Sequence, residues 1–215
     1  MELTETPAER RRHRVRARIL KAAERVFAEE GNEGLSIRRL ADEIDYSPAA
    51  IYKYFESKET LVDELKESFF ERLLQNVHTS VDASTPFEER ARKCVAAYIR
   101  TAVEKPHHYA AAFSGPFRSE GPTEGDPGFE TTQKGQAFVV LSGMVNEGIQ
   151  SGAFRHELDA SLTAKSLWAS MHGLAMMILH MPSYPSFRVD QYGMSRDVFI
   201  NFHADNLVRG LEANQ

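Results

Sequence analysis

The sequence contains very little cysteine. Its single thiol, Cys94, cannot form an intrachain disulfide, which fits a protein of a reducing compartment. We interpret Cys94 as a small buried hydrophobic residue. Metal-binding groups are also sparse. His107 and His108 are adjacent, so on a helix their rings point about 100° apart and one ion would need further ligands from elsewhere. We therefore predict no metal and no cofactor.

Long hydrophobic runs are absent as well. The most apolar stretch, residues 167–181, is interrupted by serine and histidine and is shorter than the roughly 18 apolar residues of a membrane span. The N-terminus is charged and lacks the apolar segment of a secretory signal. Together these absences predict a soluble, cytoplasmic protein without a membrane partner.

Catalytic patterns are missing too. The chain has no Gly-rich phosphate loop, no nucleophile elbow and no spacing of two carboxylates that would support acid–base chemistry. We therefore predict that the protein is not an enzyme.

Charge is present but unevenly distributed. The whole chain carries a formal net charge of −5, yet residues 10–58 hold 12 Lys and Arg against 8 Asp and Glu. The acidic balance argues against a protein that coats nucleic acid regardless of sequence. A basic N-terminal segment on an acidic body nevertheless allows a local anion-binding surface.

The apolar residues follow the period of a helix in nearly every segment, and no segment alternates long enough to form a strand. Four side chains predict helix N-termini, namely Ser36, Ser47, Ser57 and Asp159. Later helices are expected at about 86–104, after Pro106, and at about 129–150, 159–181 and 190–211. Glycine and proline predict loops at 114–128 and 182–187. We predict an all-α fold of about nine helices.

The stretch "SIRRLADEIDYSPAAIYKYFESKE" contains two short helices joined by a tight turn at Asp45 and Tyr46, a pattern typical of helix-turn-helix domains. If Ile51 faces the core, Ala49 and Lys53 point outward at 100° per residue. Small side chains allow close approach of the backbone, and a lysine binds phosphate. This exposed face therefore predicts a surface for a large anion, although a plain three-helix core with ordinary surface charge explains the pattern equally well.

The stretch resembles the N-terminal domain of the tetracycline repressor (TetR) family. The residues that carry the resemblance are Gly34, Ser36, Ile37, Leu40-Ala41, Ser47, Ile51-Tyr52, Tyr54-Phe55 and Ser57-Lys58-Glu59-Thr60-Leu61. The family often has glycine where this chain has Asp45. Because aspartate tolerates a left-handed backbone better than most residues, we expect the turn to form at slight cost.

The resemblance implies a three-helix DNA-binding domain at 13–60, with a recognition helix at about 47–55. It implies that the basic run from Arg10 to Arg18 lies near the DNA backbone, although this run also reads as a solvated helix start. The residues that it assigns to DNA are Ser36, Ile37, Arg38, Ser47, Pro48, Ala49, Ala50, Tyr52, Lys53, Tyr54 and Lys58.

The remainder, residues 61–215, is predicted to be a larger helical domain for ligand binding and dimerisation. Trp168, His172 and Gly173 are similar to a Trp-x-x-x-His-Gly element of one TetR-like subgroup. The apolar segments 159–181 and 190–211 predict a homodimer interface. Candidates for an effector pocket are aromatic, methionine and histidine side chains, namely Phe113, Phe138, Met144, Trp168, Met171, His172 and Met176; residues of these types are also common in ordinary cores.

The resemblance implies a homodimeric repressor of transcription. It would bind double-stranded operator DNA of near-palindromic sequence and be released by a small apolar or aromatic effector. Two alternatives stay open at this point: a helical ligand-binding protein without DNA activity, and a metal-dependent function built on His107 or His108. Activation rather than repression is also compatible with the sequence, since the sign of regulation depends on the position of the operator.

Overall fold

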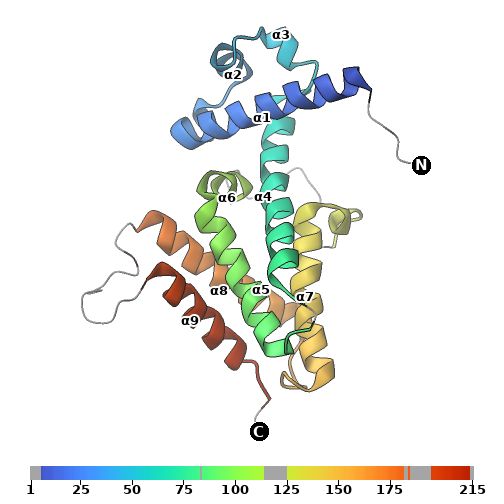
Figure 1. Ribbon diagram of the computed structural model, residues 1–215, viewed down its shortest axis with the longest axis vertical. Helices are drawn as coiled ribbons and strands as arrows, with labels where there is room; N and C mark the ends of the chain where they lie inside the picture. Colours follow the sequence, from blue (N-terminus) through green and yellow to red (C-terminus); the bar gives the residue numbers. More distant parts are fainter. Residues whose placement is uncertain (1–5, 83, 114–124, 182–183, 185–194, 214–215) are drawn as a thin grey trace. The chain divides into compact units, whose positions relative to one another are not determined.

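The computed structural model of the protein describes residues 6–82, 84–113, 125–181, 184 and 195–213. In these residues the fold is all-α, as expected, with nine α-helices and one short 3₁₀ helix (Figure 1). The helices are α1 (Pro7–Gly34), α2 (Ile37–Glu43), α3 (Pro48–Ile51), α4 (Lys58–Ser80), α5 (Phe87–Glu104), α6 (Pro106–Phe113), η1 (Phe129–Thr131), α7 (Gln133–Ser151), α8 (Ala160–His180) and α9 (Arg196–Arg209).

The helices form two compact units. Among the described residues, the first unit contains 6–68 and 107–113, and the second contains the rest. The first unit therefore includes α6, which follows α5 of the second unit along the chain. No helix in the described part of the chain has the length and apolar character that crossing a membrane requires.

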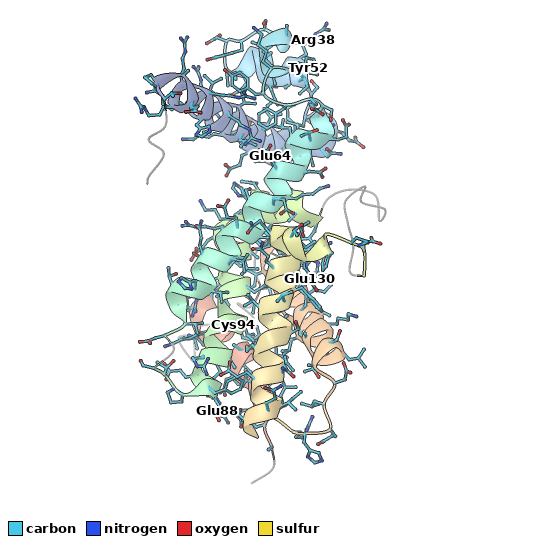
Figure 2. All side chains as sticks on the ribbon, turned by 90° about the vertical axis from the view of Figure 1, so that its right-hand side faces the viewer. Arg38, Tyr52, Glu64, Glu88, Cys94 and Glu130 are labelled. Carbon is cyan, nitrogen blue, oxygen red and sulfur yellow. The ribbon has the colours of Figure 1, made fainter. Side chains whose placement is uncertain are left out.

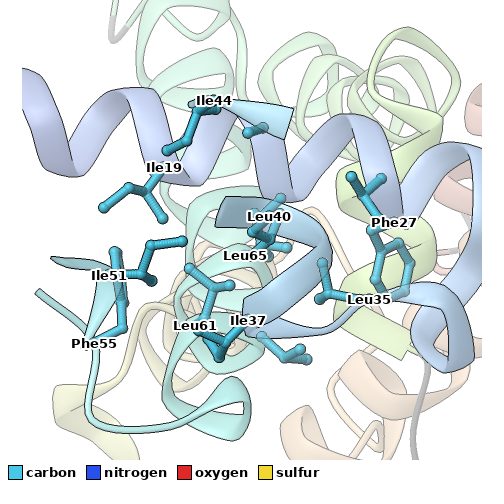
Figure 3. Packing of buried hydrophobic residues seen from close by; sticks show 14 of the residues in the cluster. Ile19, Phe27, Leu35, Ile37, Leu40, Ile44, Ile51, Phe55, Leu61 and Leu65 are labelled. Carbon is cyan, nitrogen blue, oxygen red and sulfur yellow. The ribbon is translucent and has the colours of Figure 1, made fainter. Parts of the chain in front are cut away.

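The core of the first unit is built from the apolar stripe of α1. The five buried residues of this helix are spaced i, i+3, i+4, i+7 and i+8, the period of one helix face, and are Ile19, Ala22, Ala23, Val26 and Phe27. They pack against buried side chains of α2, α3 and α4, with Ala111 of α6 at the same core (Figure 3). Gly31 has a left-handed φ of 70°, a conformation that glycine adopts without a steric penalty. The helical conformation of α1 is therefore interrupted at Gly31.

Side-chain caps set the helix starts. The hydroxyls of Ser36 and Ser47 accept hydrogen bonds from the backbone N–H groups of the third helical residues, Arg39 and Ala50. Ser57 accepts the corresponding bond from Thr60 at the start of α4. Each cap satisfies a donor that the helix itself leaves unpaired. All three predicted serine caps are confirmed.

The third helix is shorter than expected. The sequence pattern predicts a helix at about 47–55, but α3 ends at Ile51 and residues 52–54 form a turn. The Tyr54 N–H donates to the Ile51 carbonyl three residues back, at 2.8 Å. This tighter bonding is typical of a final 3₁₀ turn, and it carries the chain to Phe55, which is only 1% exposed.

The second unit is arranged around α5, which packs against α7, α8 and α9. Its apolar face supplies buried Val95, Ile99 and Ala102. At Gly148, α7 lies close to two aromatic rings, those of Phe87 at the start of α5 and of Phe154 in the segment after α7. A Cβ added at Gly148 would collide with both rings. Glycine at this position is therefore a packing requirement.

Two helix boundaries in this unit differ from expectation. The predicted helix at 129–150 is split into η1 and α7, because Thr132 adopts an extended conformation and its hydroxyl caps the Gly135 N–H at 2.9 Å. The last helix begins at Arg196, with Ser195 as its cap, rather than at 190. Residues 190–194 and the predicted loop residues 114–124 and 182–183 lie outside the described residues. The cap at Asp159 is confirmed by its bond from Leu162.

Candidate nucleic-acid interface

The turn between α2 and α3 depends on an unusual backbone conformation at one residue. Asp45 has a φ of 57° and is the one non-glycine residue with positive φ among the described residues. Aspartate enters this region more readily than most side chains. The Tyr46 N–H then donates to the Ala41 carbonyl at 2.9 Å, which closes the end of α2. The departure from the usual glycine is therefore accommodated as predicted.

The start of α3 presents a small and polar outer surface. Ile51 is fully buried and Phe55 nearly so, and this orientation leaves Ser47, Pro48, Ala49 and Lys53 exposed. Tyr52 is 54% exposed, and Figure 2 shows its side chain with that of Arg38 on the outer side of α2 and α3. A helix with small side chains outward allows a close backbone approach, which a groove-binding helix requires.

Three of the predicted DNA-binding side chains have roles inside the protein. Ile37 is 7% exposed and belongs to the hydrophobic core, so its side chain does not reach the outer surface. Tyr54 is partly buried against the same core. The Lys58 ammonium donates to the Asn32 carbonyl at 2.6 Å. The helical period by itself places Ile37 on the inner side of α2 with Leu40 and Ala41, whereas the Lys58 contact joins residues 26 positions apart and cannot be read from the local pattern.

The positive charges of α2 differ in their surroundings. Arg39 donates to Glu43 at 2.8 Å and to Glu30 at 3.0 Å, and these bonds raise its pKa. Arg38 points to solvent, and among the described residues neither Arg38 nor Lys53 has a hydrogen-bonded or ionic partner. Arg38 and Lys53 are therefore the cations of this surface that stay available for phosphate oxygens.

The candidate ligand residues are not brought together as one set. Phe113 lies in the first unit, where its ring packs 4.8 Å from that of Tyr109, whereas the other six lie in the second unit. Phe138 and Met144 are half-buried on α7. On α8, Met171 is buried and Met176 is 36% exposed, since positions five residues apart point to different sides of a helix.

Two of these candidates, Trp168 and His172, contact the same residue, Tyr98, which the sequence analysis did not identify. The Trp168 indole N–H donates to the Tyr98 hydroxyl at 3.2 Å, and this hydroxyl lies 3.3 Å from Nδ1 of His172. Tyr98 comes from α5 and is 5% exposed. Burial lowers the pKa of His172 and favours its neutral form. Only the packing of α5 on α8 brings these residues together, so no local signal identifies Tyr98.

His107, His108 and Cys94 are the residues that sequence analysis considered for metal binding or thiol chemistry. His108 lies with Nε2 2.7 Å from Glu24 and Nδ1 3.2 Å from Ser68, whereas His107 is exposed. No group of three or more potential ligands that could hold a metal ion occurs among the described residues. Cys94 is partly buried, and burial of its thiol raises the pKa to about 11, a value that favours the unreactive thiol form.

Comparisons with known proteins match both parts of the chain. The family model for bacterial regulatory proteins of the tetR family matches residues 19–65, and the model for tetracyclin repressor-like C-terminal domains matches residues 91–190. The HTH-type transcriptional repressor KstR2 of Mycobacterium tuberculosis is 29% identical over 164 residues, covering 73% of this chain and 79% of that protein. The repressor DhaR of Mycobacterium sp. strain GP1 is 27% identical, covering 74% and 79%.

Solved structures have the same fold. A protein of unknown function from Rhodococcus sp. RHA1 is 25% identical, with a TM-score of 0.73 over 92% of this chain and 95% of that one. The structure of the ketosteroid transcriptional regulator KstR2 of Mycobacterium tuberculosis is 20% identical, with a TM-score of 0.61 over 93% and 95%. The two family models together span more than half of the sequence and agree with the helix-turn-helix geometry. The chain belongs to the TetR family of helix-turn-helix transcriptional regulators.

Proposed function

We propose that the protein is a homodimeric repressor that binds a near-palindromic operator and leaves it when a small effector binds the second unit. The observation that carries the proposal is the exposed surface of α3 and of the turn after it, where Ala49 and Lys53 point outward while Ile51 is buried. Such a face can enter the major groove, where the short side chains let the backbone come close.

The proposed DNA contacts divide into two kinds. Ala49, Ala50 and Lys53 lie nearest to the base edges, and Ser36, Arg38, Ser47, Pro48 and Tyr52 contact the phosphates. Alanines carry little hydrogen-bonding information, so Lys53 and the shape of the groove provide much of the discrimination. Ile37, Tyr54 and Lys58 position the two helices through their internal contacts.

A dimer is supported by the outer surfaces of α8 and α9. Besides Trp168, whose indole N–H donates to Tyr98 of α5, six large hydrophobic side chains are exposed there, namely Leu162, Met176 and Met177 of α8, Met181 directly after it, and Val198 and Phe202 of α9. Both helices pack on α5 with their other faces. Exposed apolar area of this kind is typical of a protein interface. A two-fold dimer would present two recognition helices about 34–36 Å apart, the spacing of successive major grooves.

The effector is proposed to be apolar with a hydrogen-bonding group. Trp168, Tyr98 and His172 form a hydrogen-bonding cluster where α5 packs on α8. The name of the similar regulator KstR2 refers to ketosteroids, so steroid-like ketones are a reasonable first set to screen. Effector binding would release DNA only to the extent that it favours a dimer with differently spaced recognition helices.

The test is selection of binding sites from random duplex DNA with the purified protein. The selected duplex is then bound by wild type, Lys53→Ala and Tyr52→Phe at two salt concentrations, with Lys134→Ala on α7 as a charge-matched control. We expect a single palindromic site, at least tenfold weaker binding by Lys53→Ala, and no change with Lys134→Ala beyond about twofold. Failure to enrich any site, with weak binding equal for all variants, would overturn the proposal.

A further inference from the structure

The α6 helix is short and joins the hydrophobic core of the first unit through one residue. It has eight residues, Pro106–Phe113, and a helix of fewer than about 12 residues is marginal without outside contacts. Among the described residues of α6, Ala111 is the one that belongs to this core. Burial of a single methyl group stabilises a structure only slightly. The attachment of α6 to the rest of the unit therefore depends on its polar contacts as well.

The polar contacts of α6 with the other helices of the first unit are made by His108. Its Nε2 lies 2.7 Å from a carboxylate oxygen of Glu24 on α1, and its Nδ1 lies 3.2 Å from the hydroxyl oxygen of Ser68 on α4. The side chains of His108 and Glu24 are 18% and 34% exposed. One imidazole ring therefore joins three helices at a partly buried position.

The Ser68 hydroxyl determines whether Nδ1 of His108 carries a hydrogen. This hydroxyl donates to the Leu65 carbonyl at 2.7 Å, and a serine has one hydrogen to donate. Toward His108 the Ser68 oxygen can therefore only accept, and Nδ1 must be the donor. In a neutral ring the second nitrogen, Nε2, then carries a lone pair instead of a hydrogen.

The surroundings of Nε2 favour the charged ring. Nε2 is buried and is not aligned for a hydrogen bond with the Glu24 oxygen, so the attraction across 2.7 Å is that of opposite charges. A neutral ring would place a lone-pair nitrogen beside a carboxylate, and the two would repel each other. Protonation of His108 therefore changes the contact between α6 and α1 from repulsive to attractive.

Other charged groups of the first unit do not share this contact. In the described part of the chain, Glu24 is the one ionic partner of His108, and the neighbouring His107 is exposed. Three of the charged side chains nearby along α1 and α4 have ion-pair partners of their own. The charged residues of this unit within one turn of Glu24 or Ser68 are Lys21, Arg25, Glu64, Lys66 and Glu67.

We propose that protonation of His108 controls how firmly α6 is attached to α1 and α4. When the ring is charged, Glu24 and Ser68 hold α6 together. As pH rises and the ring loses its proton, the attraction to Glu24 is lost and α6 separates from the unit more often. The core that contains Ala111 also contains residues of α2 and α3, so loosening of α6 reaches the candidate nucleic-acid interface. The inference concerns the first unit by itself and does not rest on the proposed operator binding.

The test is hydrogen exchange of the full chain, read by mass spectrometry on peptides that cover residues 106–113. Rates are measured between about pH 5.5 and pH 8.5, where histidine titrates and glutamate stays ionised. Dividing the rate of an unstructured peptide by each measured rate gives a protection factor and removes the intrinsic pH dependence of exchange. We expect the protection of α6 to fall about fivefold as pH rises, the effect of one partly exposed ion pair.

Three variants separate this contact from other effects of pH. His108→Gln and Glu24→Gln, on two different helices, should each make the protection of α6 nearly independent of pH. His107→Gln changes the exposed neighbour on α6 and should keep the wild-type fall. A wild-type protection factor that does not change with pH would overturn the inference, and so would an equal fall in wild type and Glu24→Gln. Because the Glu24 side chain is 34% exposed, this variant should fold even if His108→Gln does not.

Discussion

The two units of the protein differ in what they leave exposed. Of the ten large hydrophobic side chains that are exposed among the described residues, Tyr52 alone belongs to the first unit, and the other nine belong to the second. The first unit buries its apolar residues around α1 and exposes alanine, serine and arginine. The second covers α5 well but leaves apolar side chains on the far sides of α8 and α9. A hydrated polyanion suits the first surface, and another protein surface suits the second.

The largest effect is expected from a substitution in the hydrophobic core of the first unit. Phe55→Ala removes a ring that is 1% exposed, and we expect it to lower the free energy of unfolding by about 3–5 kcal/mol. DNA binding should be lost with it, because Phe55 anchors the end of α3. Urea denaturation followed by circular dichroism measures the loss. Tyr52→Ala, at a 54% exposed position, should change stability by no more than about 0.5 kcal/mol.

The exposed surface of α9 offers the next largest effect. Phe202→Glu places a charge at a position 58% exposed in the single chain. If α9 forms the proposed interface, the dimer dissociation constant should rise at least about 30-fold, which corresponds to about 2 kcal/mol. Sedimentation equilibrium measures it. Val139→Glu on α7, at a position 47% exposed, is the matched control, and an equal effect of the two substitutions would count against an interface on α9.

Substitutions at Asp45 in the α2–α3 turn are expected to change the stability of the protein moderately. Asp45→Val puts a β-branched residue at a φ of 57° and should destabilise the protein by about 1–2 kcal/mol. Asp45→Gly removes the steric penalty and should be neutral or stabilising. Thermal unfolding of the three proteins gives the order. A valine variant as stable as wild type would show that the turn has another conformation in solution.

The smallest effect is expected from pH. Burial lowers the pKa of His172 and of His203, with a bond to the Ser170 backbone acting in the opposite direction at His203. The unfolded chain then binds protons more readily than the folded one. Stability from these groups is complete above the unfolded value of about 6.5 and is lost as pH falls through it.

Urea midpoints between pH 8 and pH 5 measure this dependence. His172→Gln and His203→Gln should each flatten the decline, because the group that resists protonation is gone. His156→Gln should leave it unchanged, since the His156 side chain is 96% exposed. Equal slopes for all four proteins would show that His172 and His203 do not cause the decline.

Local sequence was sufficient to predict much of the helical structure of the first unit. The stripe from Ile19 to Phe27 has the helical period, so each of its five residues points to one side whatever packs there. Serine caps and the left-handed Asp45 are equally local, since each depends on bonds within a few residues. The length of α3 was predicted wrongly because its end depends on where Phe55 and α4 must lie.

The sequence by itself determined the all-α fold, the serine-capped helix starts of the first unit and the exposed face of α3, because periodicity and capping act over one or two turns. Tertiary structure alone decided that Lys58 binds Asn32 and that Tyr98 joins Trp168 and His172. Such contacts join residues far apart in the chain, and only the packing of whole helices determines which of them meet.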